Sequence, residues 1–228
     1  MSISEINKGN NDIQQPLNSP QKSAIVDKEK MWKSPMDYTL DNSLALNTKG
    51  IVLRAFDWFR LKSCIDFKPW DKTEEYYVDV VNGPGCASLV GKQSKNGQKL
   101  ILGDGCEQVG IVEHEFLHAL GFYHEHQRFD RDSYVTINFT NVMEGKENNF
   151  DKLGKTMFTT HGTVYDYWSV MHYGPFAFSI GNGSTIIAKN PGYMNIIGQT
   201  FGMSKRDVLE MNLLYKCGML FFILILYL

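Results

Sequence analysis

The sequence predicts an α+β fold of two lobes, because helical and extended patterns alternate in its first half while its second half has few regular patterns. At 228 residues the chain is long enough to bury one sizeable core, or to form two lobes that share a cleft. Residues 1 to about 30 are rich in Asn, Gln, Ser and Lys and carry little apolar periodicity, which predicts a flexible leader.

Each element is predicted from its own pattern. Apolar residues recur at helical spacing over 48–62 and 109–120, which predicts two helices that bury apolar faces. Short β-branched or aromatic stretches between Gly, Pro and Asn predict the strands of a small sheet, and these stretches are 64–67, 76–81, 87–90 and 99–102. After Glu125 the sequence predicts a loop-rich lobe, and Ser204 with Asp207 at the box position predicts the start of a last helix.

The most informative stretch runs from His114 to Glu125. His114 and His118 are four residues apart, so they share one face of the predicted helix. Gly121 can end that helix with a positive φ and direct His124 toward the same metal. Three protein ligands with a fourth position open for water are typical of a catalytic zinc site. The sequence therefore predicts one bound Zn²⁺.

Glu115 follows the first histidine on a neighbouring helix face, where its carboxylate can reach a metal-bound water. It is predicted to be the general base of a hydrolytic reaction on that zinc-bound water. A histidine pair alone is more often a hydrogen-bonded core or surface pair. Here the adjacent Glu, the Gly and the third His favour the metal site. His126, the next histidine, is predicted to be a surface residue.

The composition of the chain limits the kinds of partner it can bind and the cellular compartment in which it folds. A net charge of −2 without a Lys/Arg run gives no reason to expect nucleic acid as a partner. Four cysteines without C-x-x-C spacing allow three pairings, and they favour an oxidising compartment. Asn138 and Asn182 begin glycosylation triplets, which agrees with secretion. Because residues 1–15 lack an apolar h-region, we expect that a signal peptide is missing from this sequence.

Several stretches resemble the astacin family of metzincin zinc endopeptidases. They are the zinc stretch with its continuation Asp-Arg-Asp at 130–132, and Ser-Val-Met-His-Tyr at 169–173, which is similar to the Met-turn of the family. Residues 59–69 are similar to the catalytic domain of meprin-type members, and the match covers 32–217. The resemblance implies a two-lobed zincin/metzincin fold, with a small twisted mixed sheet and helices above a loop-rich lobe that ends in a C-terminal helix.

The resemblance also implies roles for individual residues. It implies zinc ligands at His114, His118 and His124, and the base at Glu115. Tyr173 would be a movable extra zinc ligand that helps to stabilise the oxyanion, since a phenol can coordinate weakly and then donate a hydrogen bond. It implies an apolar floor beneath the metal at Met171, and disulfides between Cys64 and Cys217 and between Cys86 and Cys106.

Activation is a further expectation from the resemblance. Residues 1–22 would be a pro-segment remnant, in which Asp12 is a possible zymogen switch, and 23–217 the catalytic domain. A trypsin-like protease would cut between Lys22 and Ser23, and the new N-terminus would contact Glu125. The apolar tail 218–228 is too short to span a membrane, which does not favour membrane association. Two interpretations are the first half of a truncated membrane segment and an aberrant 3′ end of the gene model, and we favour the second as a hypothesis.

Together these observations predict an astacin-like metalloendopeptidase, secreted or on the extracellular face of a membrane, that hydrolyses proteins or peptides by Glu115-assisted attack of zinc-bound water. Substrate would pair as an added strand along the edge of the sheet. The alternative is a zinc-binding but proteolytically silent secreted or adhesive domain, or a truncated product that never folds. Glu115 favours the enzyme, because a silent domain has no need of the base.

Overall fold

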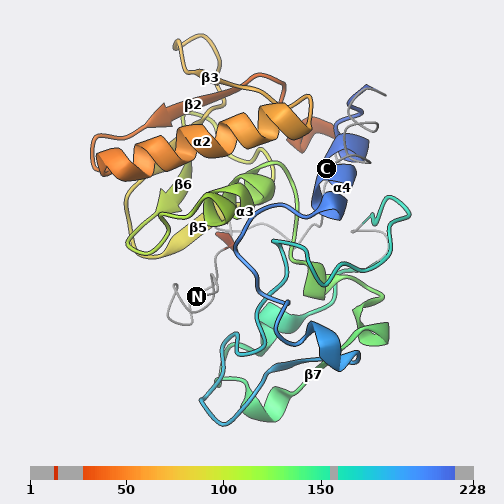
Figure 1. Ribbon diagram of the computed structural model, residues 1–228. Helices are drawn as coiled ribbons and strands as arrows, with labels where there is room; N and C mark the ends of the chain where they lie inside the picture. Colours follow the sequence, from red (N-terminus) through yellow and green to blue (C-terminus); the bar gives the residue numbers. More distant parts are fainter. Residues whose placement is uncertain (1–12, 15–27, 155–158, 219–228) are drawn as a thin grey trace.

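The computed structural model describes residues 13–14, 28–154 and 159–218, which form two lobes (Figure 1). The upper lobe in this view holds the helices α2 and α3 and a six-stranded sheet, and the lower lobe contains the strand β7. The predicted α+β, two-lobed architecture is thereby confirmed. The proposed switch residue Asp12, the expected cut between Lys22 and Ser23, and the tail from 219 onward lie outside the described residues.

The sheet of the upper lobe is mixed, as predicted, with the order β1-β5-β6-β4-β2-β3. Only the pairing between β5 and β6 is antiparallel, and the other four pairings are parallel. The strands are β1 (Ile13–Gln14), β2 (Met36–Leu40), β3 (Phe67–Pro69), β4 (Val78–Val81), β5 (Cys86–Leu89) and β6 (Gln98–Leu102). The two-residue strand β1 comes from the leader and pairs with β5, so it covers one edge of the sheet.

Two long helices, α2 (Leu46–Lys62) and α3 (Val109–Ala119), lie on one side of the sheet (Figure 1). Both agree closely with the predicted ranges 48–62 and 109–120. A cluster of phenylalanine rings fills the space between them and the sheet. Phe56 of α2 stacks on Phe67 at 3.9 Å between ring centroids and meets Phe116 of α3 edge to face at 5.0 Å. Buried aromatic pairs of this kind add to the free energy of area burial, so α3 is held firmly in the upper lobe.

No strand is predicted from the sequence at β2, although β2 pairs with both β3 and β4. Met36, Asp37 and Tyr38 are all buried, so the alternation that marks a half-exposed strand is absent. The strand predicted at 64–67 begins only at Phe67. The residues before it make other contacts, since Cys64 forms a disulfide and Ile65 donates its N–H to Ser63 Oγ.

Two disulfides join Cys64 to Cys217 and Cys86 to Cys106, which is the pairing implied by the resemblance. The first ties the residues after the C-terminal helix to the end of α2, across a sequence separation of 153. The second closes a short loop, with a sequence separation of 20, next to β5. A loop of this length corresponds to about 3 kcal/mol in the loop-entropy account of disulfide stabilisation.

The lower lobe is rich in loops, as predicted, and its only described sheet pairs β7 (Val135–Ile137) antiparallel with β8 (Ile186–Ala188). Short 3-10 helices account for most of its other regular structure, and they are η2 (Glu125–Gln127), η3 (Arg131–Ser133), η4 (Phe139–Asn141), η5 (Glu147–Phe150) and η6 (Pro191–Tyr193). One more 3-10 helix, η1 (Lys28–Lys30), lies before β2 in the chain. Asn182 is exposed, and Asn138 is partly buried and caps η4 by accepting from the N–H of Thr140.

The C-terminal helix α4 (Lys205–Leu214) begins at the predicted cap. Ser204 Oγ accepts the N–H groups of Arg206 and Asp207, and the Asp207 carboxylate accepts the N–H of Ser204, which completes a capping box. Asn212 of α4 donates to the carbonyl of Lys62 at the end of α2, so α4 returns to the upper lobe. Within the described part of the chain, no helix is both long and apolar enough to cross a bilayer.

Both ring nitrogens of the buried His172 side chain have hydrogen-bond partners within the lower lobe. The side chain is 3 % exposed, its Nδ1 donates to the Tyr173 carbonyl at 2.7 Å, and its Nε2 accepts from the Tyr165 hydroxyl at 2.6 Å. Burial lowers the pKa of His172 to about 4. The ring is therefore neutral and part of the packing at neutral pH.

We predict that His172 makes the fold sensitive to mild acid. Its pKa of about 4 in the folded chain lies below the ordinary 6.5, so the unfolded chain binds the proton first and stability falls as the pH drops from about 6.5 toward 4. In His172→Gln the loss of unfolding free energy between pH 6.5 and pH 4.5 should be smaller by about 2 kcal/mol. Urea unfolding in the presence of a chelator measures it.

The amide of Gln has one donor group and one acceptor, like the neutral ring of His172, which limits side effects of the substitution. His161→Gln is the matched control, because His161 lies in a loop and is only partly buried. It should change the acid dependence less than His172→Gln does. Equal acid dependence in the wild-type chain and His172→Gln would contradict the prediction.

Candidate metal centre

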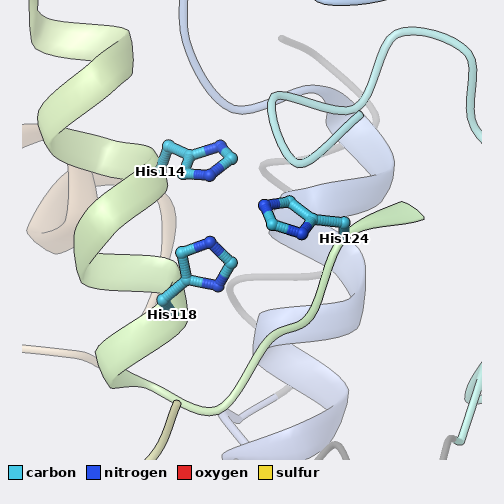
Figure 2. A group of neighbouring side chains, drawn as sticks. All are labelled: His114, His118 and His124. Atoms are coloured by element: carbon cyan, nitrogen blue, oxygen red, sulfur yellow. The ribbon is translucent and has the colours of Figure 1, made fainter. Parts of the chain in front are cut away.

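Three histidine rings converge at the junction of the two lobes (Figure 2). His114 and His118 lie one turn apart on α3, with ring centroids 4.6 Å apart. The helix ends after Ala119, and Gly121 takes φ 108°, which turns the chain back. His124 then faces the other two rings, with centroids 5.4 Å from His114 and 4.7 Å from His118.

Backbone carbonyls fix the orientation of two of these rings. His114 Nδ1 donates to the Val170 carbonyl at 2.7 Å, and His118 Nδ1 donates to the Phe122 carbonyl at 2.7 Å. A carbonyl can only accept, so Nδ1 carries the hydrogen and Nε2 keeps the lone pair in each ring. This arrangement is the one that metal-ligating histidines use, since the second nitrogen sets the tautomer.

The donor set fits zinc. One ligand nitrogen from each histidine lies within 4.8 Å of the other two, and all three side chains are buried. Neutral imidazole nitrogens suit zinc among the biological divalent ions. Among the described residues this is the one such group of histidine, cysteine or acidic side chains that could hold a metal ion.

Glu115 and Tyr173 are both buried, and Tyr173 lies directly against the site. Glu115 is on α3 between the first two histidines in sequence and has no exposed surface. The Tyr173 ring centroid lies 4.2 Å from that of His124. Tyr173 reaches the site from a turn almost fifty residues after His124, so only the resemblance could assign it a role from the sequence.

The turn at 169–173 joins the cores of the two lobes. Met171 belongs to the upper core, with α3, whereas Tyr173 belongs to the lower core. The turn is bound to the ligand segments twice, through the Val170 carbonyl and through the Met171 carbonyl, which accepts the N–H of Glu125 at 3.0 Å. The position of this turn therefore determines the spacing between the ligands.

Asp207 holds the 169–173 turn in place through hydrogen bonds, a role that the sequence does not predict. Its two carboxylate oxygens accept Ser169 Oγ at 2.6 Å and the N–H of Val170 at 2.9 Å. The same carboxylate accepts the N–H of Ser204 in the capping box. The sequence signal for the cap was correct, but it gave no sign that the capping carboxylate also reaches a segment 37 residues earlier.

His126 is not the surface residue that the sequence predicts, because it is completely buried. The short helix η2 turns its ring inward, where it stacks on Tyr173 at 4.2 Å between centroids. Its Nε2 bonds to the Asn149 carbonyl at 3.0 Å. Burial lowers the pKa of His126 well below its ordinary value, so the ring is neutral. His126 thus forms the wall against which Tyr173 packs.

Glu125 lies in a buried cluster that is rich in carboxylates. Its Oε1 accepts the N–H of Asp166 at 2.7 Å and lies 3.2 Å from Arg128 Nη1. Arg128 also pairs with Asp130 at 2.9 Å and lies 3.7 Å from Glu210. Burial raises the pKa of Glu125 well above its ordinary value, with a further rise from Glu210, and burial raises the pKa of Glu210 to about 7.

Arg128 is the largest fully buried side chain of the described chain, and sequence reasoning did not single it out. Its guanidinium pairs with three carboxylates, those of Glu125, Asp130 and Glu210, so acidic groups outnumber the basic group around it. A signal existed in the run Arg-Phe-Asp-Arg-Asp at 128–132, where two basic and two acidic residues lie close together shortly after the last ligand. Whether the cluster receives the new N-terminus stays a prediction.

Comparisons with known proteins agree with this geometry. The model of the family described as Astacin, a family of peptidases, matches residues 24–216. The chain is 43 % identical over 201 residues to meprin A subunit beta of Rattus norvegicus, and 44 % identical over 219 residues to meprin A subunit alpha of the same organism. These alignments cover 88 % and 94 % of this chain but 28 % and 29 % of the relatives, so the chain spans less than a third of their length.

A solved structure is similar over nearly the whole fold. It is high choriolytic enzyme 1, a hatching enzyme zinc-protease from the medaka fish Oryzias latipes. The match has a TM-score of 0.79 at 34 % sequence identity, and it covers 87 % of this chain and 100 % of that chain.

We predict that Asp207→Ala weakens metal binding without touching a ligand. Loss of the carboxylate frees the 169–173 turn, and with it the carbonyl that orients His114. Zinc affinity should fall roughly 10- to 100-fold, as for other groups that orient ligands. Competition with a fluorescent zinc chelator measures it. Asp151→Ala, at an exposed position, is the control and should bind zinc like the unaltered chain; equal affinities in both variants would contradict the prediction.

Proposed function

Because this chain belongs to the astacin family of peptidases, we propose that it is a zinc-dependent endopeptidase that cleaves peptide bonds within proteins. The observation that carries the proposal is the convergence of three buried imidazoles next to a buried glutamate, Glu115, which lies on the helix of the first two. A site built only to hold a structural metal would close the fourth position with another ligand and would not need that carboxylate.

His114, His118 and His124 would hold the metal through one ring nitrogen each. Zinc, when bound there, supplies a Lewis acid that polarises the scissile carbonyl and makes water a better nucleophile at neutral pH. Glu115 would take the proton of the attacking water and deliver it to the nitrogen of the leaving amine. A general acid–base group of this kind contributes about 10²- to 10⁴-fold to the rate.

Tyr173 would donate a hydrogen bond to the oxyanion as the carbonyl becomes tetrahedral. Its ring is held between His124 and His126, with centroids 4.2 Å from each. Such packing limits the ring to a small range of positions and leaves the hydroxyl as the part that can exchange partners. Met171 would support the histidines from below as part of the upper core.

We further propose that residues 1–22 are a pro-segment remnant and 23–217 the catalytic domain. In support, β1 from the leader pairs with β5 through Ile13 and Ser88 and through Gln14 and Leu89. An extended substrate that adds to the sheet would need a free strand edge, so the leader competes for backbone hydrogen bonds at that edge. Removal of the leader after Lys22 would release β5.

The buried acidic cluster around Arg128 supports the proposed contact between the new N-terminus and Glu125. A new ammonium at Ser23 would bring a positive charge to Glu125, whose carboxylate shares Arg128 with two other acids. The two disulfides and the exposed Asn182 support a secreted protein, because disulfides persist in oxidising compartments. A trypsin-like protease is the partner that the cut after Lys22 requires.

We predict that Glu115→Gln abolishes hydrolysis while zinc remains bound. Casein cleavage should fall by at least about 100-fold, because the amide cannot accept the proton, and chelator should abolish the activity of the unaltered chain. Glu113→Gln is the matched control on the same helix, since its Oε2 accepts the N–H of Met203, a bond that Gln can keep. Casein cleavage that survives in Glu115→Gln would defeat the mechanism.

We predict that trypsin activates the chain by cutting after Lys22. The active form should begin at Ser23 on N-terminal sequencing, and Lys22→Gln should stay inactive after the same treatment. Lys30→Gln is the control and should be activated normally. Glu125→Gln should be cut at the same place yet gain less activity. An active form with a different first residue would reject the assignment.

A further inference from the structure

A groove lies between α2, α3, α4 and the loops at 166–168 and 199–204. It has a volume of about 960 Å³, and we call it the α2–α4 groove. None of the three ligand histidines lines it, nor does Tyr173. The groove is therefore distinct from the cluster of ligand histidines.

Aromatic side chains line the groove and remain in contact with solvent. Trp58 of α2 is 36 % exposed, Trp168 is 49 % exposed and Phe201 is 90 % exposed. Leu209 and Val109 add partly buried aliphatic surface between them. Scattered exposed apolar residues are common, but several around one concavity usually mark a binding surface.

Positive charges surround these rings. Arg54, Lys62 and Lys205 line the groove, and none of them forms an ion pair with a described residue. Lys62 Nζ instead lies over the Trp58 ring, 4.9 Å from its centroid. The cation–π contact leaves its charge available to a ligand.

The acidic groups of the groove are already engaged. Asp166 pairs with Arg206 at 3.3 Å and accepts the Ser204 hydroxyl at 2.6 Å. Glu113 is 1 % exposed, and its Oε2 accepts the N–H of Met203 at 2.7 Å. The accessible charge of the groove is thus positive, although the net charge of the whole chain is −2.

We propose that the α2–α4 groove binds an extended segment of a partner polypeptide in which a bulky apolar side chain is flanked by Asp or Glu. The apolar side chain would lie among Trp58, Trp168 and Phe201, and the carboxylates would meet Arg54, Lys62 and Lys205. A sulfated sugar could use the cations and stack on one ring, but it has no bulky apolar side chain to cover the aliphatic surface of Leu209 and Val109. Such a site would select or hold proteins independently of the bond that is cut.

The proposal is tested with a fluorescein-labelled peptide, Asp-Glu-Leu-Phe-Glu-Asp, and the Glu115→Gln chain, which does not consume the probe. Fluorescence anisotropy should show binding about tenfold tighter than that of a peptide with Asn and Gln in place of the acids. The difference should shrink when salt is raised to about 0.5 M, since the cations lie at the surface. A peptide with Ser-Ser in place of Leu-Phe should also bind about tenfold more weakly.

Substitutions inside and outside the groove test whether the peptide binds there. Arg54→Glu with Lys205→Glu should weaken binding of the acidic peptide about tenfold, whereas Lys99→Glu with Lys189→Glu, at exposed positions outside the groove, should not. Phe201→Ser should weaken it about fivefold, whereas Leu46→Ser, at an equally exposed apolar position on α2, should not. In the chain with Glu115 intact, these changes should leave cleavage of a short neutral peptide unaltered.

Three results would overturn the proposal. They are equal affinity for the acidic and the neutral peptide, equal affinity of the groove variants and their controls, and displacement of the peptide by a sulfated heparin hexasaccharide that itself binds more tightly. The last result would assign the groove to a glycan. None of these measurements depends on zinc or on hydrolysis, so their failure would leave the proposed endopeptidase function intact.

Discussion

The hydrogen bond from His114 Nδ1 to the Val170 carbonyl is the interaction on which the rest of the site depends. It joins α3 of the upper lobe to the 169–173 turn, and that turn carries Tyr173 into the core of the lower lobe. Asp207 holds the same turn through Ser169 and Val170. Because these three segments, distant in sequence, must meet to orient one ring, the metal site can form only in the folded chain. Folding and metal binding are therefore coupled.

The lower lobe has little regular structure, so side-chain interactions must hold its loops. The buried cluster around Arg128 does this by joining η2 to Asp166 and to Glu210 of α4. Burying several carboxylates with one guanidinium is costly, as the raised pKa values of Glu125 and Glu210 show. The hydrogen bonds and ion pairs of the cluster must offset this cost.

The sequence allows local features to be predicted far better than distant ones. The helix of the ligands, the helix-ending Gly121 and the cap at Ser204 follow from spacing alone, because each depends on neighbours within one or two turns. Tyr173 and the disulfide pairs came only from family resemblance, since no local pattern encodes a contact between segments so far apart. For a related reason, the sequence does not predict the strand β2, and it wrongly predicts His126 to be a surface residue. Burial on all sides removes the polar and apolar alternation that local reasoning uses.

In the proposed function, the sheet edge at β5 would link the leader to the reaction. A strand edge can pair with one extended segment at a time, so a leader paired at Ser88 and Leu89 and a substrate on that edge exclude each other. The pairing that the structure describes is short, with Ile13 opposite Ser88 and Gln14 opposite Leu89, and therefore gives few hydrogen bonds. Such a contact can persist while the leader is tethered, because the tether keeps its local concentration high. If the chain is cut at the proposed site after Lys22, that advantage would be lost, and a substrate with more strand residues would take the edge.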